Sequence, residues 1–166
     1  MTSPEASRPH MPGYGIAGPN ESGGLLPWAW AEERLLRSHD YWLATVRPDG
    51  APHVMPVWAV WAQGAAWFSS SGASRKTRNL AADARAVITT DDPLHPVVVE
   101  GVATRVVDPE AIARFAHWVN TKYETDYPDA FFTENACFCL TPATVFSLDE
   151  ANFAGSPTRW TFEPGV

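Results

Sequence analysis

The sequence predicts a mainly β protein, a small antiparallel barrel with two or three peripheral helices. Short apolar segments recur along the chain and are separated by glycine and proline turn signals. Helical spacing of apolar residues extends over only a few stretches. With 166 residues, 45% of them apolar, the chain is long enough for one core and too short for two comfortable domains.

The first element is expected close to Leu25. Residues 1–24 are rich in Pro, Gly and Ser and lack periodicity, which is typical of a disordered arm, so the folded domain is predicted to span 25–166. A short amphipathic helix is predicted over 27–38, because one stripe of it carries Trp28, Ala31, Leu35 and Leu36.

A β-hairpin follows. Its strands are predicted at 41–46 and 52–61, and Arg47-Pro48-Asp49-Gly50 between them has Pro at the second and Gly at the fourth place of a type I turn. Gln63-Gly64 forms the next turn, and a third strand at 65–70 leads into a serine-rich loop.

The second half adds two helices and the remaining strands. Ser74 is a helix cap for a segment reaching about residue 82, and Asp108 with Pro109 begins the longest helix, in which apolar residues keep helical spacing to Tyr123. Residues 123–135 are long enough for a mobile loop beside a pocket. The predicted strands are 84–90, 97–107, a single strand or a pair over 136–140 and 143–148, and 158–162.

Charge and composition exclude several classes of partner. The net charge of −7 gives no general attraction to nucleic acid or anionic lipid. No apolar run approaches the roughly 20 residues of a membrane helix, and the first residues lack the apolar stretch of a signal peptide, so we expect a cytoplasmic protein. Cys137 and Cys139 are expected as reduced core residues, with metal binding the minor alternative, and the scattered histidines predict no metal site.

The stretch SSSGASRKTRNL, residues 69–80, gathers three of the twelve Lys and Arg residues. If Ser74 caps a helix, Arg75 and Lys76 lie in its first turn, where the helix dipole disfavours cations. An anion at that end would compensate, because free backbone N–H groups point at it and Arg75, Lys76 and Arg78 add charge-assisted hydrogen bonds. This favours a phosphate site, and the alternative is a solvated cationic face.

Two other interpretations of this stretch fail on spacing. Arg75 stands where a Walker loop needs Gly before its Lys-Thr pair, and Ala73 stands where the S-x-x-K motif needs serine. The serines therefore read as loop donors. His53 lies on a predicted strand at alternating positions with Met55 and Val57, where a packed, hydrogen-bonded histidine is the first expectation.

Taken in order, LATVRPDGAPHVMPVWAVW, WFSSSGASRKTRNLAADARAVIT, VVVEGVATRVVD and the terminal TRWTF resemble the pyridoxamine 5′-phosphate oxidase-like split β-barrel superfamily. More narrowly, they resemble its flavin- and deazaflavin-dependent oxidoreductases. The resemblance spans residues 28–163 and implies an FMN-binding-protein-like split barrel that forms a homodimer, with each cofactor site built from both subunits.

The resemblance also implies a role for each motif. The HVMPVW segment would run beside the cofactor ring, and Arg75, Lys76 and Arg78 would hold its phosphate. Arg159-Trp160 match a pair that reaches across the dimer, although a tryptophan that closes the core is an equal alternative. The cofactor-binding residues so assigned are His53, Val54, Met55, Pro56, Val57, Trp58, Ser69, Ser70, Ser71, Arg75, Lys76, Arg78, Asn79, Arg159 and Trp160.

The implied function is hydride transfer between a deazaflavin, coenzyme F420, and a small conjugated organic substrate. FMN is the alternative cofactor, because both molecules carry a tricyclic ring and a phosphate. A non-catalytic flavin, deazaflavin or haem carrier is the rival class. No carboxylate or histidine is placed as a proton donor, and the sequence does not identify the substrate.

Overall fold

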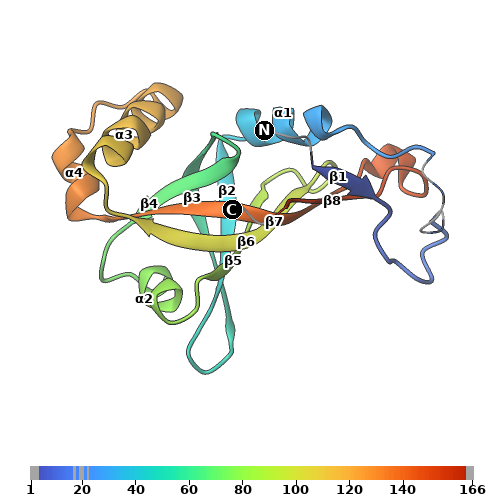
Figure 1. Cartoon of the computed structure of the whole chain (residues 1–166), viewed down its shortest axis with the longest axis horizontal. Helices are drawn as coiled ribbons and strands as arrows, with labels where there is room; N and C mark the ends of the chain where they lie inside the picture. Colours follow the sequence, from blue (N-terminus) through green and yellow to red (C-terminus); the bar gives the residue numbers. More distant parts are fainter. Residues whose placement is uncertain (1–3, 17, 19–20, 22, 164–166) are drawn as a thin grey trace.

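The computed structural model describes residues 4–16, 18, 21 and 23–163, and within them eight strands form one antiparallel sheet. Six of these strands close a barrel (Figure 1). Around it run β2 (Asp40–Val46), β3 (Pro52–Ala62), β4 (Ala65–Ser70), β7 (Ala136–Ser147), β6 (Val97–Val106) and β5 (Arg85–Thr90), which returns to β2. The predicted mainly β barrel with peripheral helices is confirmed.

Two tight turns set the register of the first three strands. At the β2–β3 turn the Gly50 N–H donates to Arg47 O at 2.8 Å, and Gly50 has φ of 83°. At the β3–β4 turn both Gln63 and Gly64 have positive φ, the geometry that matches strand twist in two-residue hairpin loops. Both predicted turns are therefore confirmed.

Residues 136–147 form one strand, β7, although Pro142 interrupts its pattern of N–H donors. The β6–β7 register shifts here, because Gly101 pairs with Pro142 whereas Glu100 pairs with Thr144. One extra residue, Ala143, is accommodated as a β-bulge. A Cβ on Gly101 would lie 2.1 Å from the Thr141 carbonyl oxygen, so the bulge requires glycine on the opposite strand.

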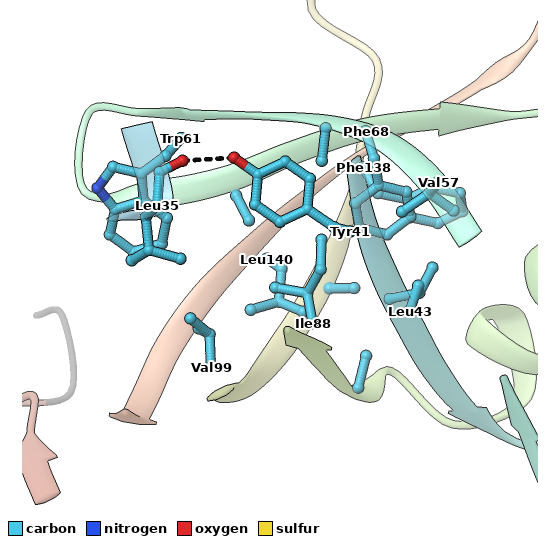
Figure 2. Packing of buried hydrophobic residues seen from close by; sticks show 14 of the residues in the cluster. Leu35, Tyr41, Leu43, Val57, Trp61, Phe68, Ile88, Val99, Phe138 and Leu140 are labelled. Carbon is cyan, nitrogen blue, oxygen red and sulfur yellow. Dashed lines mark hydrogen bonds between the residues drawn. The ribbon is translucent and has the colours of Figure 1, made fainter. Parts of the chain in front are cut away.

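The barrel interior is the main core (Figure 2). Helix α1 (Trp28–Arg37) covers one end of it with Ala31 and Leu35, and the Tyr41 hydroxyl donates to the Leu35 carbonyl. Leu36 departs from the predicted apolar stripe because it faces solvent, with 58% of its surface exposed. The inward-facing strand residues include Leu43, Val57, Phe68, Ile88, Val99, Phe138, Leu140 and Trp160.

A second core lies between the barrel and helices α3 (Pro109–Tyr123) and α4 (Asp129–Glu134). The prediction of a mobile loop at 123–135 is wrong, because this segment contains α4. Phe132 of α4 is 1% exposed and packs on Phe115 with ring centroids 5.4 Å apart. The Asn120 side chain also ties the connection down, through Nδ2 to Tyr127 O at 2.9 Å and Oδ1 from Tyr127 N at 3.0 Å.

The disordered arm predicted over residues 1–24 is corrected in its described part. Strand β1 (Glu5–Ser7) pairs with β8 (Thr158–Thr161), which also pairs with β7. Arg8 follows, 3% exposed, and its guanidinium donates to four backbone carbonyls, including Gly155 O at 2.8 Å. The amino-acid composition of the segment does not predict long-range contacts of this kind. Residues 1–3, 17, 19–20 and 22 lie outside the described residues.

The remaining elements are α2 (Arg75–Ala82), which lies at the opposite end of the barrel from α1 in Figure 1, and a short 3₁₀ turn, η1 (Glu150–Asn152). None of the helices in the described chain is long and apolar enough to cross a membrane.

Candidate functional site

The start of α2 is held by a network of serine and threonine hydroxyls. Ser74 has extended backbone and its Oγ accepts the Thr77 N–H at 3.2 Å, which is the predicted N-cap. The same oxygen receives the Ser70 hydroxyl at 2.9 Å, and the Thr77 hydroxyl donates to Ser71 O at 2.9 Å. These serines fix the loop against the end of β4, which leaves them as capping groups rather than nucleophiles.

Three cations surround this helix start. Arg75 and Arg78 are exposed, Lys76 is half-buried, and none of the three forms an ion pair within the described residues. The N–H groups of a helix's first turn also lack intrahelical acceptors. Unpaired cations at the positive end of a helix are unfavourable for folding, so this arrangement suits an anion such as a phosphate.

Three polar side chains, Asn79, Thr45 and His53, connect α2 with β2 and β3. Asn79 of α2 is fully buried, and its Nδ2 donates to Thr45 Oγ1 at 2.9 Å. His53 is the cross-strand partner of Thr45. Two buried polar atoms here, His53 Nδ1 and Asn79 Oδ1, have no hydrogen-bond partner among the residues that the structure describes. The sequence predicted a packed, hydrogen-bonded His53, but its Nδ1 has no partner among the described residues. Asn79 attaches α2 to β2 through its buried side chain.

The His53 imidazole lies in a positive electrostatic environment. Burial lowers its pKa below the usual 6.5, and the nearby cations Arg47, Lys76 and Arg75 lower the pKa further. Arg47 was absent from the predicted site. It precedes the Pro-Asp-Gly turn at the end of β2, and only the folded hairpin brings it close to His53.

The segment of β3 predicted to run beside a cofactor ring presents mixed faces. Val54, Met55 and Trp58 are between 44% and 50% exposed, and Pro56 is also exposed. Val57 points into the core at 6% exposure, so its side chain does not belong to a surface site. The Trp58 ring stacks on Tyr123 of α3 at a centroid distance of 4.3 Å, which leaves one ring face covered by protein.

Below this stack, α3 is attached to the barrel by polar contacts that the sequence did not predict. Lys122 Nζ donates to Tyr41 Oη at 3.0 Å and to Ala59 O at 2.8 Å. The Tyr123 hydroxyl accepts the Ala59 N–H and donates to His39 O at 2.6 Å. Burial lowers the pKa of Lys122 to about 8 and raises that of Tyr123 to about 12.

The outer face of β2, β5, β6 and β7 forms an apolar hollow of about 550 Å³. Ala44, Val46, Val87 and Val102 line it, with Arg85 and Glu100 also in its wall. Trp42 and Val54 extend the same outer face of β2 and β3, because they alternate with core residues, and both are about half exposed. A single chain thus leaves a large apolar face in water.

The carboxy-terminal pair does not join this site within one chain. Arg159 pairs with Phe146, ten residues along β7 from Ala136, the partner of Ser70. At about 3.3 Å per residue, some 30 Å separate the two ends of that strand. Trp160 is fully buried and meets Trp28 edge to face at 5.6 Å. The expectation that Trp160 binds a cofactor is therefore corrected, and the alternative that it closes the core is confirmed.

The two cysteines are free thiols in the structure, as expected. Cys137 is buried and lies in contact with Phe132 O, and burial raises the pKa of its thiol to about 11. Among residues 4–16, 18, 21 and 23–163, no three His, Cys, Asp or Glu side chains gather closely enough to hold a metal ion.

Comparison with known proteins matches residues 30–147 to the family described as pyridoxamine 5′-phosphate oxidase. No curated protein sequence matches the chain significantly. A conserved hypothetical protein of Mycobacterium tuberculosis is 25% identical and has a TM-score of 0.71, covering 88% of this chain and 96% of that one.

Two further solved structures have ligands in their names. An F420 reductase is 27% identical with a TM-score of 0.56, over 67% of this chain and 91% of that one. A haem-binding protein of Mycobacterium smegmatis is 28% identical with a TM-score of 0.56, over 79% of this chain and 62% of that one.

Proposed function

Because this chain belongs to the pyridoxamine 5′-phosphate oxidase family, we propose that it is an oxidoreductase that uses the deazaflavin coenzyme F420. The proposed reaction is hydride transfer between that cofactor and a small conjugated organic substrate. The observation that carries the proposal is the cationic cluster at the start of α2, Arg75, Lys76 and Arg78, which forms no ion pair with another described residue and fits a phosphate group. The similarity to an F420 reductase supports the choice of a deazaflavin.

The residues present divide the proposed work between two places. Arg75, Lys76 and Arg78 would hold the phosphate, and the exposed β3 segment from Val54 to Trp58 would lie beside the ring. When bound, the cofactor supplies the hydride chemistry, and the protein supplies orientation and exclusion of water. Trp58, fixed from behind by Tyr123, is a rigid apolar wall suited to that second task.

We further propose that the active form is a homodimer. Trp42, Val54 and Val102 are each 46–50% exposed on one outer barrel face, which also contains the 550 Å³ hollow. Exposed apolar patches are typical of protein–protein interfaces, and a second copy of the chain would cover this one. A shared interface of this kind would also complete the cofactor site with residues from the partner.

Two alternatives to this proposal would use the same cationic cluster, one with another cofactor and one with another function. FMN also carries a phosphate and suits the family, so the cations alone do not distinguish it from the deazaflavin. A carrier function without catalysis is supported by the similarity to the haem-binding protein. An enzyme needs open space over the ring for a substrate, and a carrier does not.

The deciding experiment is to titrate the purified protein with F420 and, separately, with FMN. Binding is measured by the quenching of tryptophan fluorescence. We expect tighter binding of the deazaflavin. Tighter binding of FMN, or a yellow protein that carries FMN from expression, would reverse this choice. Mixing the protein and reduced F420 with quinones or conjugated ketones then separates the classes, because a carrier would not accelerate oxidation of the cofactor.

A further inference from the structure

His53 is the one titratable side chain of the α2 site that lies among cations without a compensating anion within the described residues. Three cations act on its pKa, Arg47 from the β2–β3 turn and Arg75 and Lys76 from α2. The side chains that adjoin it from β2 and α2, Thr45 and Asn79, are neutral. A positive imidazole in this position would be repelled by three cations.

The hydrogen-bonding groups around His53 leave its Nδ1 able to carry a proton. His53 Nδ1 and Asn79 Oδ1 are both buried, and neither has a hydrogen-bond partner in the described part of the chain. Thr45 connects the two residues, since its hydroxyl accepts from Asn79 Nδ2 at 2.9 Å and lies 3.5 Å from His53 O. An imidazolium carries N–H groups on both ring nitrogens, so protonation guarantees a donor at Nδ1, which the neutral ring has in only one of its two tautomers.

We propose that His53 takes up a proton when an anion binds at the start of α2, so that anion binding and His53 protonation favour each other. A bound dianion would offset the field of Arg47, Arg75 and Lys76 and so remove the main obstacle to a charged imidazole. The inference rests on the proposed phosphate site and adds a pH dependence to it. Binding would be strongest on the acidic side of neutrality.

The linkage has a definite sign. In the free protein, burial and the nearby cations hold the pKa of His53 below its usual value, which favours the neutral imidazole. Bound negative charge raises that pKa, and by linkage the affinity for the anion rises as pH falls through this range. One pKa unit of change on His53 corresponds to about a tenfold change in affinity.

The test uses inorganic sulfate, which keeps two negative charges from pH 5.5 to pH 8.0 and therefore does not titrate itself. Calorimetry on the full chain should show sulfate binding about tenfold more tightly at pH 5.5 than at pH 8.0. The variant His53→Asn should lose this dependence. His117→Asn is the matched control, because His117 is exposed on α3, and it should behave like the wild type.

A second measurement does not depend on the variant folding. The imidazole resonance of His53, assigned through its proximity to Thr45, should titrate at a higher pH when sulfate is saturating. Lys76→Ala tests the anion site separately from the proton coupling, because it should abolish sulfate binding at both pH values. If wild-type binding needs Lys76 but does not vary with the state of His53, the proton coupling is wrong and the anion site stands. If sulfate does not bind, or binds equally well to Lys76→Ala, both the anion site and the coupling are wrong.

Discussion

At the residue scale, Lys76 provides the direct test of the phosphate site. Lys76→Ala removes a charge-assisted hydrogen bond, for which about 1.5–3 kcal/mol is typical, so cofactor affinity should fall about ten- to hundredfold. Stability of the free protein should stay the same or rise slightly, because a cation leaves the first turn of α2. Calorimetry and urea denaturation measure the two effects.

The control for that variant is Arg37→Ala, which removes an exposed cation of α1 that pairs with Glu33. It should leave cofactor affinity unchanged. Full affinity in both Lys76→Ala and Arg78→Ala would mean that the cluster is only a solvated face.

Lys122 predicts a rise of stability with alkaline pH. Its pKa is about 8 in the fold, because of burial, against a usual 10.5, so between these values the unfolded chain binds more protons than the folded one. The stabilising contribution is complete above about pH 10.5 and is lost as pH falls to 8. Asp40 acts against this shift, and Tyr41 and Tyr123, whose pKa values are raised, oppose it above pH 10.

The measurement is the free energy of unfolding in urea between pH 8 and pH 10. It should increase in the wild type, and the increase should disappear in Lys122→Met, which keeps the apolar stem but cannot titrate. The same slope in both proteins would show that Lys122 is not the group responsible.

At the element scale, α2 separates helix capping from anion binding. Ser74→Ala removes the acceptor for the Thr77 N–H and should destabilise the protein by about 0.5–2 kcal/mol. Ser74→Asp restores a cap and favours the helix dipole, so stability should return, but its negative charge would repel a phosphate. Thermal unfolding should show the lower stability of Ser74→Ala. A binding titration should show a cofactor affinity about tenfold lower in Ser74→Asp than in the wild type.

Equal affinity in Ser74→Asp and the wild type would count against an anion at this position. The two substitutions are matched, because Ser74→Ala removes the cap without adding charge and Ser74→Asp keeps a cap but adds a negative charge.

Local signals explain which elements were predictable. The Arg47–Gly50 turn, the Ser74 cap and the Asp108-Pro109 helix start are each encoded within four residues, and the structure has all of them. The strand β1 and the helix α4 were missed for a common reason. Both are stabilised by residues distant in sequence, β1 by Thr161 and its neighbours and Phe132 by Phe115, and no local pattern reports such contacts.

In the candidate site, too, some residues could be predicted from local sequence and others could not. Arg75, Lys76 and Arg78 were visible as a short cationic run after a capping serine. Arg47 and Thr45 enter the site through strand pairing and helix packing, so their place there required the fold. Trp160 was ambiguous because a buried and an interfacial tryptophan have the same sequence signature.

At the scale of the whole molecule, the exposed barrel face predicts assembly. Sedimentation at micromolar concentration should give a species of twice 18.2 kDa. Val102→Lys should shift this toward monomer, because Val102 lies in the apolar hollow and is already 47% exposed in one chain. A monomeric wild type would contradict both the dimer and the shared site.

The matched control is Val107→Lys, 76% exposed just beyond the end of β6 and not part of the hollow. It should stay dimeric. If both substitutions or neither of them dissociated the protein, this face would not be the interface.

The pairing of β1 with β8 has a practical consequence for engineering. Glu5 faces Thr161 across the sheet, so the two ends of the described chain are neighbours. A short peptide joining them should permit circular permutation, with new ends opened at the exposed Asp91–Leu94 connection. In the intact chain, a tether on either end would emerge from the same edge of the sheet, at the far end of β7 from Ser70, and would leave the α2 face open for ligand measurements on an immobilised protein.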